Sequence, residues 1–132
     1  MNEAEHECAM GRLAAGHGVA TYLEAVTETH SNRPAVVMEF AAGQNLDLLV
    51  ADRGSIAAID AVRIVASIAR TLARLHDLRN SHLPHGMCHG DVKPHNILTM
   101  NEDTVLIDFE HAHPISSSSN RAFTGGTSAY SP

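Results

Sequence analysis

Residues 87–112 constrain the fold of this chain more than any other stretch, because short apolar segments there alternate with a polar loop. The loop at residues 89–96 reads HGDVKPHN, and an apolar pair follows it at residues 97–98. A polar turn at residues 101–103 then leads into a second apolar segment at residues 105–107. Apolar segments joined by such a turn predict two paired strands. The pairing would bring the polar loop next to the residue that follows the second strand.

The polar side chains of this stretch suit phosphoryl transfer, which depends on positioning and charge neutralisation more than on covalent chemistry. Asp91 could accept or orient the proton of an attacking hydroxyl, and Lys93 could reach a terminal phosphate. Asn96 and Asp108 offer oxygen ligands of the kind that Mg²⁺ prefers. Pro94 stiffens the loop and biases the residue before it to an extended conformation. We expect catalysis by Asp91, Lys93 and Asn96, and metal binding by Asn96 and Asp108.

The string HGDVKPHN, followed by DFE at residues 108–110, resembles the H-R-D-x-K-x-x-N and D-F-G motifs of eukaryotic-type serine/threonine protein kinases. The resemblance implies ATP and Mg²⁺ as cofactors and a protein substrate with a Ser or Thr acceptor. The alternative is a β-hairpin with a merely solvated polar tip, which leaves the spacing of the whole set to chance.

Two positions depart from the kinase pattern. Gly90 stands where many kinases have an Arg, which predicts little dependence on phosphorylation of the activation loop. Glu110 replaces the Gly after Asp-Phe, and the combination HGD…IDFE also resembles small-molecule phosphotransferases of the aminoglycoside and choline kinase type. Lys93 favours the protein kinases, because the small-molecule enzymes usually carry another residue there.

Length and composition set the outer limits. The 132 residues, 44% of them apolar, suffice for the core of one domain or part of one. The formal net charge of −6 argues against a nucleic-acid partner. Only Cys8 and Cys88 occur, and no apolar run could span a bilayer, so we expect no membrane segment and a cytoplasmic location.

Residues 1–15 are rich in helix formers and begin with acids, which predicts an amphipathic helix. The side chains expected to face inward are Met10, Leu13 and Ala14. By resemblance this is the C helix of a kinase, whose acid would be Glu7. Glu5 and, in another register, His6 stay open for that position. Lys93 is the only lysine, so no second lysine can contact the inner phosphates of ATP.

Residues 19–27 and 35–40 predict two antiparallel strands joined by a polar turn. They resemble strands four and five of the kinase small lobe, with Met38 as the gatekeeper or as ordinary core. The segment that follows would be the hinge that binds adenine. The expected nucleotide contacts are Glu39, Ala41, Asn45, Leu98 and Asp108.

A short helix is expected at residues 45–50, closed at Arg53-Gly54, and a longer helix reaching His76 with Ser55 as a candidate cap. Apolar residues recur along the longer helix at steps of four and three, as Ala61, Val65, Ile68, Leu72 and Leu75. This stripe is wide enough to be buried on more than one side.

The histidines and cysteine near the polar loop could supply ligands for a structural zinc ion: His82, His85, Cys88 and His89. Because Cys88 and His89 would point to opposite faces of a strand, this arrangement is disfavoured. His89 is instead expected to be buried and hydrogen-bonded, bracing the loop with Phe109 packed beside it.

The C-terminal residues 124–132, TGGTSAYSP, resemble the end of a kinase activation segment, where Thr127 and Tyr130 match. The sequence as a whole predicts an incomplete α+β, protein kinase-like fold. Residues 1–40 would be a small-lobe portion, and residues 41–132 a large-lobe portion with the catalytic loop and activation segment. The expected function moves the ATP γ-phosphate to a protein hydroxyl, with the isolated chain inactive. The alternatives are a small-molecule phosphotransferase and a non-catalytic, pseudokinase-like binding module.

Overall fold

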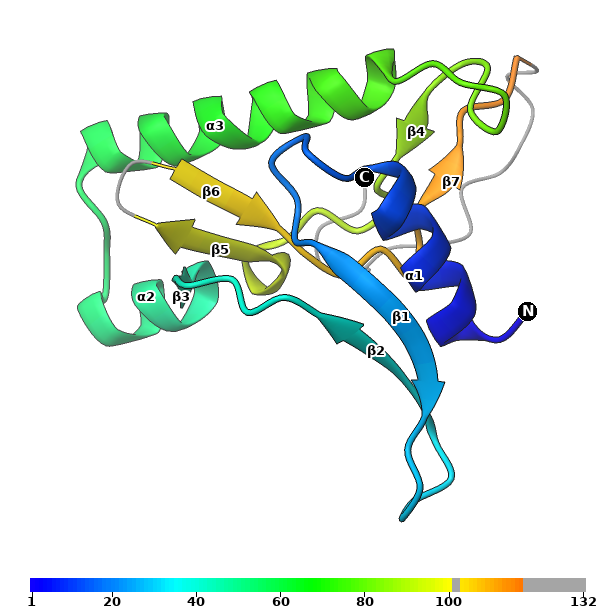
Figure 1. Ribbon diagram of the computed structural model, residues 1–132. Helices are drawn as coiled ribbons and strands as arrows, with labels where there is room; N and C mark the ends of the chain where they lie inside the picture. Colours follow the sequence, from blue (N-terminus) through cyan, green and yellow to red (C-terminus); the bar gives the residue numbers. More distant parts are fainter. Residues whose placement is uncertain (101–102, 118–132) are drawn as a thin grey trace.

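The computed structural model describes residues 1–100 and 103–117 (Figure 1). The helices are α1 (Glu3–Leu13), α2 (Leu46–Arg53) and α3 (Ala58–Asp77), with a 3-10 turn at Pro94–Asn96. The strands are β1 (Tyr22–Thr27), β2 (Pro34–Met38), β3 (Gln44–Asn45), β4 (Met87–Cys88), β5 (Ile97–Met100), β6 (Asp103–Leu106) and β7 (His113–Pro114). This mixture of helices and small sheets agrees with the predicted α+β class.

Helix α1 begins with a capping box. The Asn2 side chain accepts a hydrogen bond from the Glu5 N–H at 2.9 Å, and the Glu5 carboxylate accepts one from the Asn2 N–H at 2.9 Å. The buried residues of the helix are small: Ala4, Cys8 and Gly11. Ala14 is buried as predicted, but Met10 and Leu13 lie half-buried at the edge of the core. Small side chains let α1 approach β1 closely, so the buried face of the helix is centred on its smallest residues. The prediction followed the larger apolar side chains and therefore placed that centre wrongly.

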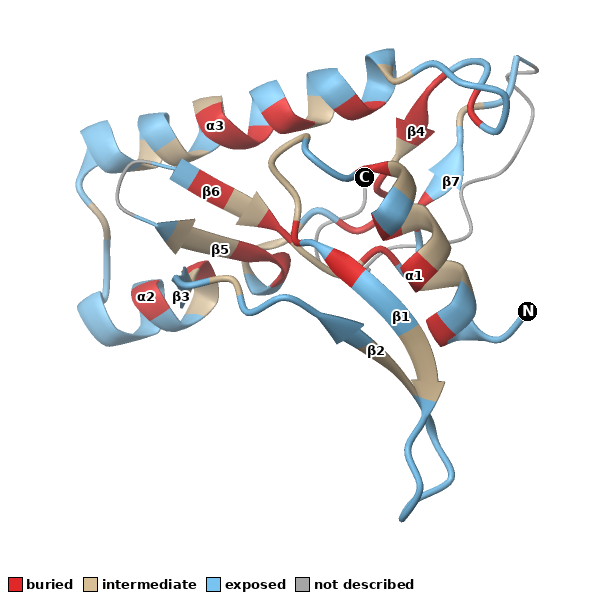
Figure 2. Ribbon diagram, viewed as in Figure 1, coloured by how far each residue is buried: buried red, intermediate tan, exposed pale blue. Residues whose placement is uncertain are grey.

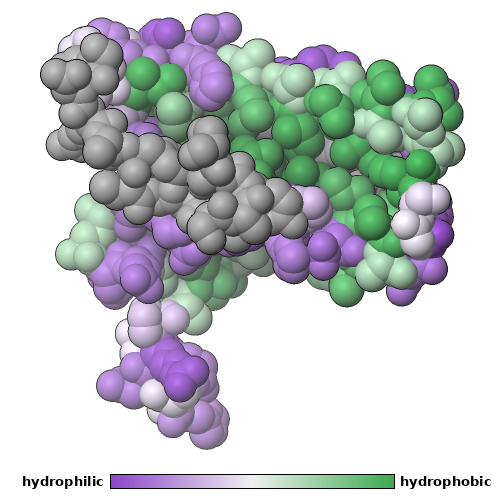
Figure 3. Space-filling model, turned by 180° about the vertical axis from the view of Figure 1, so that it is seen from behind, coloured by the Kyte–Doolittle hydropathy of each residue, from purple (hydrophilic) through white to green (hydrophobic). Residues whose placement is uncertain are grey.

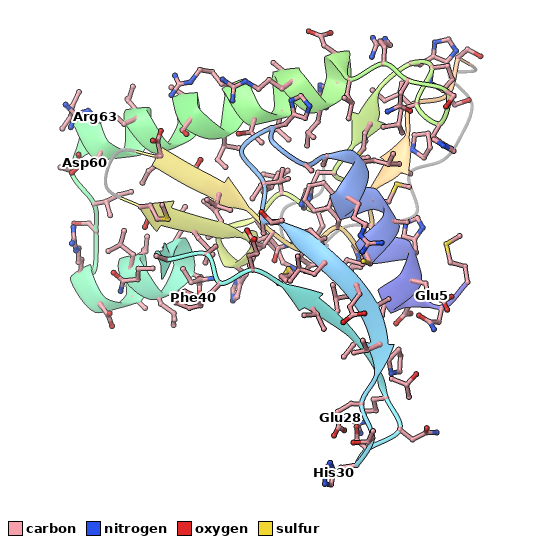
Figure 4. The ribbon with its side chains drawn as sticks, viewed as in Figure 1. Glu5, Glu28, His30, Phe40, Asp60 and Arg63 are labelled. Atoms are coloured by element: carbon pink, nitrogen blue, oxygen red, sulfur yellow. The ribbon has the colours of Figure 1, made fainter. Side chains whose placement is uncertain are left out.

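Strands β1 and β2 form an antiparallel arm that projects from the rest of the protein (Figure 1). The tip of the arm is closed by the Glu28 carboxylate, which accepts hydrogen bonds from the N–H groups of His30 at 3.0 Å and Ser31 at 2.7 Å. Figure 4 labels Glu28 and His30 at this tip. Both strands are shorter than predicted, because residues 18–20 pair with the central sheet and residues 39–43 leave β2 as a link to β3.

The central sheet has the strand order β3-β5-β6. The β5–β6 hairpin predicted from residues 97–107 is confirmed, with Ile97 opposite Leu106. On the far side of β6, the Leu106 N–H donates to the Gly18 carbonyl and the Leu106 carbonyl accepts from the Ala20 N–H, each at 3.0 Å. Strand β5 starts directly after the 3-10 turn, and β6 ends two residues before Asp108. The central sheet therefore positions both segments of the predicted site, namely the polar loop before β5 and the Asp that follows β6.

Two sequence signals set the ends of α2. The Asn45 side chain accepts a hydrogen bond from the Asp47 N–H at 3.0 Å, and Gly54 ends the helix at φ 72°. Helix α2 continues past Val50 to Arg53, and the predicted closure at Arg53-Gly54 is confirmed. The prediction of Ser55 as the cap of α3 is wrong, because α3 begins after Ala57 without any side-chain cap.

Helix α3 packs one face against β6 and β4. Ile68 and Leu75 are buried on that face, with Ala61 and Leu72 half-buried beside them. Its exposed apolar side chains include Ile59, Val62 and Val65, at 59%, 64% and 68% of full exposure (Figure 2). Within the described residues, α3 is therefore buried on one face only, and the prediction that it is buried on more than one side is wrong for this part of the chain. The face in Figure 3 carries a broad apolar area on the side where α3 begins.

The loop before the polar stretch places His82 and His85 on the surface, whereas His89 is buried. Residues 1–100 and 103–117 contain no group of three or more His, Cys, Asp or Glu side chains arranged to hold a metal ion. Within the same residues, no helix is long and apolar enough to cross a membrane.

Candidate active site

The polar loop begins with a turn that favours glycine. Gly90 has φ 85°, in the left-handed region, and a Cβ at this position would lie 2.4 Å from the His111 carbonyl oxygen. This close approach follows from the pairing of β4 with β7, which sets Cys88 opposite His113. The Gly in place of the kinase Arg thus has a steric reason that the sequence comparison did not reveal.

Asp91, Lys93 and Asn96 form one hydrogen-bonded group. The Lys93 Nζ lies 2.6 Å from the Asp91 Oδ2, and the Asn96 Nδ2 donates to the Asp91 carbonyl oxygen at 3.0 Å and to its Oδ2 at 3.3 Å. Asp91 and Asn96 are each only 4% exposed. The hydrogen bond to Asp91 raises the pKa of Lys93, so the ammonium stays charged at neutral pH. The group holds one carboxylate in a defined orientation.

His89 braces this loop, as predicted. Its Nδ1 accepts a hydrogen bond from the Asp91 N–H at 3.3 Å, so the proton is assigned to Nε2, which donates to the Ile107 carbonyl oxygen at 3.1 Å. The Phe109 ring lies edge-on to the imidazole, with the ring centres 4.7 Å apart. Burial lowers the pKa of His89 and so favours the neutral ring that both hydrogen bonds need.

Asp108 reaches the same site from β6. The Ile107 N–H donates to the Asn96 carbonyl oxygen at 3.0 Å, which joins the two segments. Asp108 has φ 67°, and its charge, like that of Asp91, helps to raise the pKa of Lys93. Because the Asn96 Nδ2 is engaged by Asp91, the oxygens that could hold a divalent cation are the Asn96 Oδ1 and the Asp108 carboxylate. The structure brings together the residues predicted to be catalytic and metal-binding.

Helix α1 adds a carboxylate to this site. The Tyr22 hydroxyl donates a hydrogen bond to the Glu7 Oε1 at 3.1 Å. Burial, followed by the nearby charge of Asp108, raises the pKa of Glu7. The two alternatives for the acid of the C helix point elsewhere: Glu5 belongs to the capping box, and the His6 Nε2 lies 2.8 Å from a backbone carbonyl of residue 112.

No motif in the sequence points to Tyr22 as part of the site. The same hydroxyl that binds Glu7 accepts a hydrogen bond from the Asp108 N–H at 3.0 Å. Burial raises the pKa of Tyr22 far above its usual value, so the phenol stays protonated. One signal could have located it: Gly11 lies inside a helix, where glycine costs about 1 kcal/mol and indicates a close packing partner.

A cleft of about 750 Å³ lies beside the polar site. Of the predicted nucleotide contacts, Glu39, Ala41, Asn45 and Leu98 line it, as does Met38, whereas Asp108 does not. Both ends of the Asn45 amide are engaged, because its oxygen caps α2 and its nitrogen donates to the His95 carbonyl oxygen. A ribose hydroxyl would have to compete with these bonds. Phe40, on the cleft wall, is 93% exposed (Figure 4).

The two activation-segment predictions, Thr127 and Tyr130, lie outside the described residues. So does the end of the serine run.

The family model for the protein kinase domain matches residues 2–132. The chain is 30% identical over 112 residues to the "Probable serine/threonine-protein kinase PknB" of Corynebacterium glutamicum. That match covers 83% of this chain and 16% of the relative, so the chain spans a small part of the relative's length. With the motif residues brought together as described, the chain belongs to the protein kinase domain family.

Proposed function

We propose that this chain carries the catalytic loop and the metal-binding Asp of a serine/threonine protein kinase, which moves the γ-phosphate of Mg·ATP to a protein hydroxyl. The observation that carries the proposal is the meeting of Asp91, Lys93 and Asn96 with Asp108 at the end of the β5–β6 hairpin. Residues 1–40 would serve as a small-lobe portion and residues 41–132 as a large-lobe portion, with the nucleotide in the cleft between them.

Each residue has a distinct role in this proposal. The acceptor oxygen bonds to the γ-phosphorus while the bond to the β–γ bridging oxygen breaks, and the acceptor's proton passes to Asp91. Lys93, held 2.6 Å from Asp91, offsets negative charge that develops on the transferred group. Asn96 and Asp108 would hold Mg²⁺, which neutralises the phosphate oxygens when bound.

The composition limits what the isolated chain can do. Lys93 is its only lysine and lies in contact with Asp91, so the inner phosphates of ATP find no second lysine in these 132 residues. We therefore expect weak nucleotide affinity and negligible turnover from this chain alone. A non-catalytic, pseudokinase-like binding module would share the weak turnover, but its nucleotide binding would not depend on metal.

Calorimetric titration with ATP, in Mg²⁺ and in EDTA, tests this proposal. We expect binding in Mg²⁺ that weakens by at least about tenfold in EDTA and in the Asp108→Ala variant. Asp60→Ala is the matched control, because Asp60 lies on the surface of α3 in an exposed ion pair with Arg63. Equal binding in Mg²⁺ and in EDTA would favour the non-catalytic module.

A second candidate function follows from Glu110, which stands in place of the kinase Gly and lies close enough to affect the pKa of Lys93. That residue matches the small-molecule phosphotransferases. A substrate panel on a longer protein that contains this chain separates the two. Phosphate incorporation into casein is expected, whereas incorporation into an aminoglycoside or choline, but not into protein, would reverse the assignment.

A further inference from the structure

Tyr22 makes contacts that the roles assigned above do not use. Its side chain is only 4% exposed, and its hydroxyl lies between two different elements. The hydroxyl donates to the Glu7 Oε1 at 3.1 Å and accepts from the Asp108 N–H at 3.0 Å. One phenol thus connects a carboxylate of α1 with the backbone of the residue proposed to bind metal.

The position of the Tyr22 ring depends on Gly11. A Cβ built on Gly11 would lie 2.2 Å from the Tyr22 Cδ2 and 2.4 Å from its Cγ, which is too close for non-bonded carbons. The ring therefore rests directly on the backbone of α1. On its other side it meets the Phe109 ring edge-on, with the ring centres 5.8 Å apart and the planes at 77°. These contacts leave the hydroxyl little freedom to move.

The backbone of Asp108 gives the contact its importance. Asp108 has φ 67°, in the left-handed region that few residues other than Gly adopt and that the surrounding structure has to stabilise. Strand β6 ends at Leu106, so sheet pairing does not hold the Asp108 N–H. The phenol oxygen of Tyr22 is the acceptor for this N–H. The direction of the Asp108 carboxylate depends on the backbone angles that this hydrogen bond holds.

We propose that Tyr22 is a positioning residue: its hydroxyl joins Glu7 of α1 to the Asp108 amide and so sets the direction of the metal-binding carboxylate. Gly11 belongs to the same device, because it makes room for the ring. The metal-related part of this inference rests on the proposed function, whereas the part about the Asp108 backbone does not. A displacement of α1 would reach Asp108 through one side chain.

The first test measures the Asp108 backbone directly, without nucleotide. In Tyr22→Phe the ring keeps its packing and only the hydroxyl is lost. Amide hydrogen exchange at Asp108, followed by NMR, is expected to speed up at least about tenfold, because the amide loses its acceptor. Thr104→Val is the matched control, since it removes a buried hydroxyl that donates to the Ser67 Oγ at 2.9 Å. In this control the Asp108 exchange rate should stay within about twofold of wild type. Unchanged exchange in Tyr22→Phe would overturn the inference.

The second test asks whether the contact serves metal binding. Calorimetry should show Mg·ATP affinity reduced about three- to tenfold in Tyr22→Phe, with the affinity for ATP in EDTA unchanged. A merely structural defect would reduce both affinities together, and this result would overturn the positioning role. If the wild-type chain binds no Mg·ATP, the proposed function fails, and the exchange measurement still decides the part played by Tyr22.

A second variant, Gly11→Ala, tests the same contact without removing the Tyr22 hydroxyl. Gly11→Ala should displace the ring and speed up exchange at Asp108 as much as Tyr22→Phe does, because the new Cβ and the ring cannot both keep their places. In the double variant the two effects should not add, since the same hydrogen bond is lost in each. Additive effects would mean that Gly11 acts on Asp108 by another route.

Discussion

Replacing Phe109 by Ala tests whether the aromatic contacts behind the site hold it together. Phe109 is fully buried, and its ring meets Tyr22 and His89 edge-on, with ring centres 5.8 Å and 4.7 Å away. Truncating a buried Phe costs about 3–5 kcal/mol, of which each aromatic pair accounts for about 0.5–1.5 kcal/mol. With a urea dependence of about 1–3 kcal/mol/M, the unfolding midpoint should fall by on the order of 2 M.

The chain offers a matched control for this experiment. Phe40 is 93% exposed, so Phe40→Ala should change the free energy of unfolding by no more than about 0.5 kcal/mol. Urea titrations followed by circular dichroism compare the two variants. If Phe109→Ala unfolds the chain outright, Phe109→Leu keeps most of the volume and should cost about 1–3 kcal/mol, because it removes both aromatic pairs. Equal midpoints for Phe109→Ala and Phe40→Ala would refute the burial argument.

Three further changes should alter stability in predictable ways. Gly90→Ala should lower the free energy of unfolding by about 1–3 kcal/mol, because residue 90 has φ 85° and a Cβ there would meet the backbone of residue 111. Chemical denaturation measures this loss, and an unchanged free energy of unfolding would refute the close approach. Asn45→Ala should cost about 1 kcal/mol through the lost cap of α2, visible as a lower melting temperature, whereas an unchanged melt would contradict the capping role. Folding lowers the pKa of His89, so the unfolded chain binds more protons as the pH falls below about 6.5. The stability due to the neutral ring is complete above that pH and is lost as the pH falls from there toward the lowered pKa. Melts between pH 7.5 and 5 should therefore decline less steeply in His89→Gln than in the wild type, and equally steep declines would contradict the burial effect; His30→Gln, on the exposed arm, is the control.

The parts of the fold that could be predicted are those whose contacts join segments close together in the sequence. The loop at residues 89–96 and the hairpin after it are consecutive, so their turn and strand signals were enough to place Asn96 beside the backbone of Ile107. The bracing role of His89 followed for the same reason. Its ring forms hydrogen bonds with two segments, the polar loop and the end of the second strand, which a single hairpin joins.

The parts that failed depend on contacts between distant segments. The packing of α1 on β1 through Gly11 and Tyr22 joins residues in different elements, and no local pattern reveals that a missing side chain makes room for a ring. The prediction that α3 is buried on more than one side failed for a different reason. Its apolar periodicity is real, but periodicity shows which side chains are apolar and not whether a neighbour covers Val65.

The left-handed backbone of Asp108 has a consequence for attempts to engineer this protein. A glycine would adopt φ 67° more readily, so a library selected only for resistance to heat would tend to enrich Asp108→Gly. The selected variants would be more stable to heat but would lack the carboxylate that we propose binds Mg²⁺. Selection for robustness should therefore always be paired with a screen for nucleotide capture, because at this one position the two goals oppose each other.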